Sequence, residues 1–326
     1  MRANAAVLLA AAVWPRSPPS RLLVPSSPED DFALLQRRIG EQKSINSIDT
    51  IVLPEVLLPG QRMRLSLMPE EMSDLLRNSQ TVGVLGQTTI GADAGGAGRE
   101  TCVLSHGVEA SVTELVRESN DAGYGDAWRW SATLIGGRIF ERQQEAQPSA
   151  AVAAADRLPG AASVLVAEEV RWLDVGLADE LSAARSRSRS VELAARELGP
   201  LVATWLDLAR GGGANLWGKS RQQARPTSGG VDPGVDKAEL EAAIDRMLAD
   251  LGEMPGVDRP SKRALWVTAL INPCNADRHS WPVLDVRSAV LTAKTPLERL
   301  SVAKTGMVDS IYKLKGGNWP MNTYYW

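Results

Sequence analysis

Apolar residues in the first half of the chain alternate with polar ones or form short extended runs, a pattern that predicts β-strands. The run from Ile51 to Leu67 is interrupted by Pro54 and by Pro59-Gly60, so it predicts two strands joined by a turn. Amphipathic segments at 30–42 and 69–79 predict two short helices. Further strands are predicted at 81–87, 101–119, 127–145 and 162–175.

Glycines lie inside two of these strand segments. Gly107 falls in the middle of 101–119, and Gly136-Gly137 falls in the middle of 127–145. Glycine inside a strand often marks a bulge or a bend, because it adds no side chain to the packing. We therefore expect each of these segments to divide into two strands.

The hydrophobic period changes to that of a helix after residue 177. Apolar residues recur at helical spacing from Leu177 to Arg210, where Gly199-Pro200 is expected to kink the helix or split it in two. A capping box at 236–239 and the helix-start signature Thr295-Pro296-Leu297-Glu298 begin two later helices, and 261–272 is a compact apolar helix. Strands come first and helices second, so the sequence predicts an α+β fold rather than an alternating α/β fold.

Composition and charge exclude one class of partner. The 326 residues are 44% hydrophobic and 23% charged, as in ordinary globular proteins, and the net charge is −3. The one basic run, at 185–190, stands among Glu180, Glu192 and Glu197, which is typical of a solvated helix face. We expect a folded protein that does not bind nucleic acid.

The N-terminal segment differs from the rest of the chain. It carries Arg2, Arg16 and Arg21 and no acidic residue before Glu29, and its apolar run from Ala5 to Val13 is too short to span a bilayer, which needs about 20 residues. This composition suits an organelle transit peptide, a secretory signal or a disordered tail of a cytosolic protein. Of the organelles we favour the chloroplast over the mitochondrion. No segment predicts a membrane span.

The stretch GANLWGKS fits the phosphate-loop pattern G-x-x-x-x-G-K-[ST] at Gly213, Gly218, Lys219 and Ser220. A working phosphate loop follows a buried strand and opens a helix, so that the phosphates lie at the helix N-terminus. Here the preceding segment has helical periodicity, and Pro226 soon follows the motif. We interpret the match as a coincidence inside a Gly-rich linker.

The sequence contains few other candidates for catalytic or metal-binding residues. Cys102 and Cys274 are far apart in the sequence and form no C-x-x-C pair, although the sequence allows a disulfide between them. A zinc site would require both cysteines to converge with His106 and His279, or with carboxylates in their place. A single His such as His106 is more often an ordinary polar residue than a base. The sequence therefore predicts no catalytic residue, no cofactor and no metal site.

Seven segments, taken in order, resemble the N-terminal substrate-binding domain of Lon protease, which also occurs in cereblon and in stand-alone proteins. The first, VLPEVLLPGQRMRLSLMPEEMSDLL, follows the family's proline–apolar–Pro-Gly pattern at Pro54, Leu57, Pro59 and Gly60. The resemblance covers 51–314. The other segments are TVGVLGQ, GVEASVTELVRE, WSATLIGGRIFERQQ, VLVAEEVRWLDV, ALWVTALINP and TPLERLSVAKTGMVDSI.

The resemblance implies a fold and a division of the chain. The fold is α+β, with a small PUA-like β-barrel followed by a C-terminal helical bundle. Met68-Pro69-Glu70 replaces the family's usual Phe-Glu-Pro order, and loops at 88–100, 146–160 and 211–234 are inserted. The divisions are a targeting peptide or tail at 1–30, the barrel lobe at 31–176, the helical lobe at 177–315 with a Gly-rich insertion at 211–234, and an aromatic tail at 316–326.

The resemblance also implies a function. It predicts a non-catalytic module that binds exposed apolar or extended segments of other proteins, as an adaptor or substrate-binding factor in organelle protein quality control, where an organelle protease is a partner. We expect neither the ATPase and protease modules of full Lon proteases nor the zinc-bearing domain of cereblon. The alternative is an enzyme whose site is built from dispersed residues; peptide binding without turnover would distinguish the two.

The C-terminal segment GGNWPMNTYYW is rich in aromatic residues, with Trp319, Tyr324, Tyr325 and Trp326 in its last eight positions. Aromatic side chains are favoured at interfaces, which makes these four candidate protein-binding residues. The interpretation that we prefer is that the tail folds back and covers an apolar edge of the protein.

Overall fold

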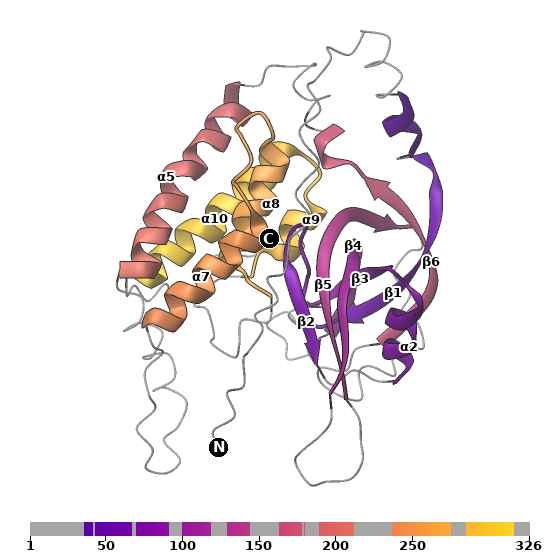
Figure 1. The fold of residues 1–326 in the computed structure, drawn as a ribbon. Coiled ribbons are helices and arrows are strands. Elements are labelled where there is room, and N and C mark those ends of the chain that lie inside the picture. Colours follow the sequence, from indigo (N-terminus) through magenta and orange to yellow (C-terminus); the bar gives the residue numbers. More distant parts are fainter. Residues whose placement is uncertain are drawn as a thin grey trace, which may run out of the picture.

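The computed structural model describes residues 36–41, 43–66, 70–90, 100–118, 129–143, 163–177, 179, 189–211, 237–274 and 285–315. These form a mixed α+β fold in which a six-stranded sheet lies on one side and a group of helices on the other (Figure 1). The order along the chain is strands first and helices second, as the sequence pattern predicts. None of the described helices is both long and apolar enough to cross a bilayer.

The sheet has the strand order β2-β5-β4-β3-β1-β6, and β6 also pairs with β5. Because β6 pairs with both β1 and β5, the strands β5, β4, β3, β1 and β6 form a ladder that closes on itself. Neighbouring strands are antiparallel except β1 and β3, which are parallel. The strands are β1 (Ile45–Leu53), β2 (Arg62–Ser66), β3 (Thr81–Ile90), β4 (Glu100–Glu118), β5 (Arg129–Arg142) and β6 (Ser163–Leu173).

The prediction that glycine divides β4 and β5 is wrong, because each is a single strand. The glycines allow other atoms to come close instead. A Cβ on Gly107 would lie 2.5 Å from the Phe140 ring and 2.6 Å from the Val84 carbonyl oxygen, and a Cβ on Gly136 would lie 2.3 Å from the Leu58 carbonyl oxygen. The β4–β5 register does shift just after Val108, so the irregularity there is a bulge within a continuous strand.

The helices follow the predicted segments with one addition. Pro200 lies inside a continuous α5, so the helix is not split there. The capping box before α10 is present: the Thr295 side chain accepts from the Glu298 amide, and the Glu298 carboxylate accepts from the Thr295 amide. The addition is α9, which has six residues. The helices are α2 (Glu70–Asn78), α5 (Arg189–Gly211), α7 (Lys237–Leu251), α8 (Pro260–Ile271), α9 (Arg287–Thr292) and α10 (Pro296–Leu314).

Helix α8 lies at the centre of the helical side. Every residue of α8 except Lys262 is buried, and the helix packs on α10, α5, α7 and α9. The hydrophobic core around it also takes in side chains from the sheet side, including Leu58, Val108 and Ile139. The sheet and the helices thus share this cluster, whereas two further clusters of the described residues belong to the sheet side.

Candidate binding site

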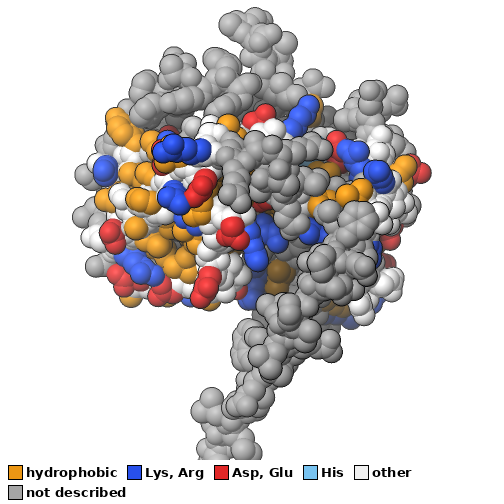
Figure 2. All heavy atoms as spheres, turned by 90° about the horizontal axis from the view of Figure 1, so that it is seen from above, with side chains coloured by type: hydrophobic (Ala, Val, Ile, Leu, Met, Phe, Trp, Pro, Cys, Tyr) orange, Lys and Arg blue, Asp and Glu red, His pale blue; other side chains and the backbone are white. Residues whose placement is uncertain are grey.

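A cleft of about 490 Å³ opens where the sheet meets the helices. Its walls come from the second half of β5, the end of β6, the turn at Pro59-Gly60, the helical turn at 36–41, the loop after α7 and the first turns of α8. We call it the sheet–helix cleft. In the view from above, Lys and Arg side chains gather around a hollow between the two halves of the molecule (Figure 2). The apolar lining of the sheet–helix cleft includes Ile139, Trp172, Leu173, Leu251, Leu265 and Trp266.

Trp172, on β6, forms the sheet-side wall and is held by two neighbours. Its ring meets the Phe140 ring edge to face at a centroid distance of 6.0 Å, and the Arg138 guanidinium lies 4.1 Å from the indole centroid. Arg138 is itself fixed by hydrogen bonds of 2.8 and 3.1 Å to the Glu109 carboxylate, which raise the pKa of Arg138. The indole is therefore held in a fixed position.

Trp266, on α8, forms the helix-side wall. Its indole N–H donates to the Gly252 carbonyl oxygen at 3.1 Å. Gly252 ends α7 with a φ of 68°, a left-handed conformation that glycine adopts without strain, and its amide donates to the Leu248 carbonyl oxygen. This contact fixes the loop after α7 against α8, and with it the helix-side wall.

Charged side chains of both signs line the cleft, and two of the three cations are already paired. Arg38 Nε lies 2.7 Å from the Asp174 carboxylate, and Arg138 binds Glu109. Lys262 is exposed and makes no ion pair with any residue that the structure describes. Its ammonium group is thus the cation most available to a bound molecule.

The segment after β6 connects the sheet to the helices and forms part of the cleft wall. Asp174 accepts hydrogen bonds from Arg38 and from the Leu177 amide at 2.9 Å. Burial alone would raise the pKa of Asp174, but these hydrogen bonds outweigh it and hold the pKa below its ordinary value. The ionised carboxylate therefore stabilises this wall at neutral pH.

Asp179 caps the N-terminus of α8 from a distant part of the chain. Arg259, at the N-cap position, makes no side-chain cap, and the first turn of α8 has no acidic residue. Asp179 instead accepts from the Ser261 hydroxyl at 2.6 Å and from the Ser261 amide at 3.0 Å, and a carboxylate is favourable at the positive end of a helix. Burial raises the pKa of Asp179, and the hydrogen bonds and the charge of Arg299 counter only part of this effect.

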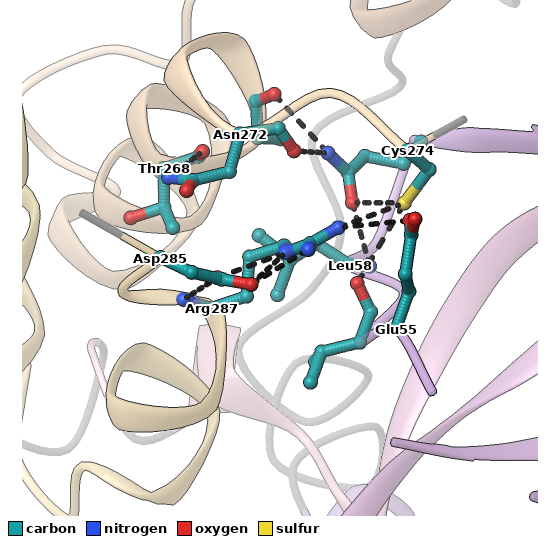
Figure 3. Close-up of polar contacts among 10 residues, drawn as sticks. Glu55, Leu58, Thr268, Asn272, Cys274, Asp285 and Arg287 are labelled. Carbon is teal, nitrogen blue, oxygen red and sulfur yellow. Dashed lines mark hydrogen bonds and ion pairs between the residues drawn. The ribbon is translucent and has the colours of Figure 1, made fainter. Parts of the chain in front are cut away.

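Gln61 caps the C-terminus of α8. Its amide group donates to the carbonyl oxygens of Ala269 at 3.1 Å and Asn272 at 2.8 Å, and its carbonyl oxygen accepts from the Leu58 amide at 3.0 Å (Figure 3). In a longer helix the Ala269 carbonyl oxygen would accept from residue 273, which is a proline and has no N–H. Both ends of α8 are thus held by side chains from outside the helix itself, and Gln61 comes from the sheet side.

A second polar group beside Gln61 is built around the guanidinium of Arg287. Arg287 donates to the Asp285 carboxylate at 2.6 Å and lies 3.5 Å from both the Glu55 carboxylate and the Cys274 sulfur (Figure 3). Burial raises the pKa of the Cys274 thiol to about 12, so the thiol is protonated and unreactive at neutral pH. Both Cys274 and Cys102 are free, and within the described residues no group of His, Cys, Asp and Glu is arranged to hold a metal ion.

Most of the residues singled out from the sequence belong to parts of the chain that the structure does not describe. Gly213, Gly218, Lys219 and Ser220 fall outside the described residues, as do His279 and the four aromatic residues of the C-terminal tail. His106 lies on β4, hydrogen-bonded to the Ser105 hydroxyl at 3.0 Å, and burial lowers its pKa. His106 does not line the cleft.

The sequence interpretation does not identify the cleft residues. Trp172 and Trp266 stand in segments whose apolar periods predict a strand and a helix, and periodicity alone assigns both side chains to the core. The one available signal is the residue type, because tryptophan is enriched at binding surfaces. Which tryptophans face a cleft depends on how the sheet packs on the helices.

Neither a protein-family model nor a curated protein matches the chain. Among solved structures, it is similar to a Lon N-terminal domain protein from Xanthomonas campestris, with 15% identity and a TM-score of 0.32, over 78% of this chain and 95% of that one. It is also similar to the N-terminal domain of the Mycobacterium avium complex Lon protease, with 17% identity and a TM-score of 0.36, over 80% of this chain and 98% of that one. Both structures are named for the family that the sequence resembles.

Proposed function

We propose that this protein is a non-catalytic binding module whose sheet–helix cleft holds an extended segment of another polypeptide. The observation that carries the proposal is that two indoles, those of Trp172 and Trp266, are held in fixed positions on the walls of one cleft. Fixed aromatic side chains in a pocket are the usual anchors of protein interfaces, because they bury a large apolar area at little entropic cost.

The chemistry of the lining supports a polypeptide ligand. The walls are apolar and suit aliphatic or aromatic side chains, whereas the rim carries Arg38, Glu41, Arg138, Glu253 and Lys262, which suit the polar groups of a backbone or of flanking side chains. The volume lies within the range of about 300–1,000 Å³ that is typical of ligand pockets.

The finer parts of the proposal extend the family resemblance. We infer that the strand ladder that closes on itself is a PUA-like barrel, that the helices after residue 177 form a bundle, and that the protein acts as an adaptor beside an organelle protease. The segment 1–30 would direct it to the chloroplast. A fusion of this segment to a fluorescent protein should enter plastids, and diffuse cytosolic fluorescence would contradict the targeting proposal.

The binding proposal can be tested with a fluorescein-labelled, permanently unfolded chain such as reduced and carboxymethylated lactalbumin. Trp172→Ala should weaken binding at least tenfold, measured by fluorescence anisotropy, because it removes an aromatic anchor. Trp130→Ala is the matched control: Trp130 lies on β5, also stacks with an arginine (Arg77, at 4.8 Å), and does not line the cleft. Equal affinities for the two variants would reject the cleft as the site.

A second pair of variants tests the rim, and a third measurement tests for an enzyme. Lys262→Glu reverses the exposed cation of the cleft, and Arg246→Glu makes the same charge change on an exposed position of α7. Only the first should alter the affinity. Cleavage or modification of the bound chain, seen by mass spectrometry, would favour the alternative of an enzyme with a dispersed site.

A further inference from the structure

One face of the helical side carries large apolar side chains that are exposed. On α10, Leu297 is 43% exposed, Val308 is 42% exposed and Tyr312 is 38% exposed, and on α5 Leu193 is 59% exposed. Positions 297, 308 and 312 are separated by 11 and 4 residues, which places their side chains on the same side of a helix. We call these four side chains the α5–α10 face.

The two helices lie side by side and run in the same direction. Lys304 Nζ lies 2.7 Å from the Glu197 carboxylate, and the Trp205 indole N–H donates to the Ser310 hydroxyl at 2.7 Å, so later residues of α5 meet later residues of α10. Leu193 lies one turn before Glu197, and Val308 one turn after Lys304. Figure 1 shows both helices in the helical half of the molecule, with α5 at its outer edge, and none of the four side chains lines the cleft. The face is therefore distinct from the sheet–helix cleft.

We propose that residues 316–326 fold back over the α5–α10 face and cover it. This segment follows directly on α10, begins with Gly316-Gly317, and contains no charged side chain. Adjacent glycines allow the chain to reverse its direction. The eleven residues, when extended, span about 36 Å, whereas the 19 residues of α10 span about 28 Å. The segment is thus long enough to reach every part of the face.

The aromatic residues of the segment can supply the apolar cover that the exposed side chains of the α5–α10 face lack. Trp319, Tyr324, Tyr325 and Trp326 are large amphipathic side chains, each able to bury about 150–250 Å². The face itself is a narrow strip, interrupted by the Lys304–Glu197 ion pair, and its four partly exposed side chains supply far less than the ~800 Å² per partner of a standard interface. A single chain segment, such as residues 316–326, fits this strip better than a second copy of the protein does.

The test is a double-mutant cycle on the melting temperature. Four proteins are compared: the full chain, the chain ending after Lys315, and each of these with Val308→Glu. We expect the Val308→Glu substitution to lower the melting temperature by several degrees more in the full chain than in the shortened chain, because the glutamate loses the contacts of the partly buried Val308 in both proteins but meets an apolar covering segment only in the full chain. Ile45→Glu is the control, since Ile45 is 60% exposed on β1 and should have the same effect in both lengths.

Two outcomes would overturn the proposal. One is an equal effect of Val308→Glu in both lengths. The other is a fall in the molar mass measured by light scattering when Val308→Glu is introduced into the full chain, since a second copy, and not residues 316–326, would then be covering the face. If the shortened chain does not fold, Trp319→Ser in the full chain replaces the deletion, with the same expectations.

Discussion

Replacing Gln61 should destabilise the protein more than its position in a loop suggests. Gln61 is 4% exposed, and its side chain satisfies the amide of Leu58 and the carbonyl oxygens of Ala269 and Asn272. Methionine has a similar length and shape but no hydrogen-bonding group at these positions. The Gln61→Met variant would therefore leave three buried backbone groups without their partner.

The magnitude follows from the cost of an unsatisfied buried group, about 1–3 kcal/mol. At the low end of that range, the three groups together cost about 3 kcal/mol of unfolding free energy. In a protein of 150–250 residues, a loss of this size lowers the melting temperature by about 6–12 °C, and the fall is slightly smaller in a longer chain such as this one. Because Pro273 removes the donor that would otherwise serve Ala269, the helix cannot repair the loss by adding a turn.

The assay is urea denaturation followed by circular dichroism, with Gln80→Met as the control because Gln80 is exposed. The Gln61→Met midpoint should fall while the slope against urea stays unchanged, and the control should match the wild type. A Gln61→Met midpoint equal to that of the control would refute the idea that Gln61 holds α8 to the sheet side.

The remaining predictions concern Asp174, Cys274 and the phosphate-loop motif. The Asp174 carboxyl has a lowered pKa, so its contribution to stability is present above the ordinary pKa of 3.8 and is lost as the pH falls through the folded-state pKa. The Asp174→Asn variant should therefore be less stable than wild type at pH 7. Thermal unfolding measured from pH 7 to pH 2 should show that this difference in stability shrinks below pH 3.8. In a Cys102→Ser background, Cys274 should react with Ellman's reagent at pH 8 far more slowly in the native protein than in urea, and equal rates would contradict its burial as a protonated thiol. Lys219→Ala should leave stability and polypeptide binding unchanged, whereas micromolar ATP binding that disappears in this variant would show that the motif is functional.

The sequence by itself determined the local structure. Alternating apolar residues predicted the strands, the change to helical spacing predicted the later helices, and the sequence Thr295-Pro296-Leu297-Glu298 predicted where α10 begins. These features depend on neighbours within a few residues, so a local pattern can specify them. Where local reasoning failed, at Gly107 and Gly136, the cause was a contact with a residue far along the chain, namely the Phe140 ring in the first case and the Leu58 carbonyl in the second.

Only the tertiary structure decided the site. Gln61 meets the end of α8 across 208 residues, and Asp179 meets its beginning across 82 residues. These contacts fix α8 between the sheet and the other helices, and the position of α8 in turn brings Trp266 to the same cleft as Trp172. A period of two or of 3.6 residues shows that a side chain is turned towards the interior, but it does not show which distant segment it meets there. The cleft therefore exists only through packing between segments that the sequence keeps far apart.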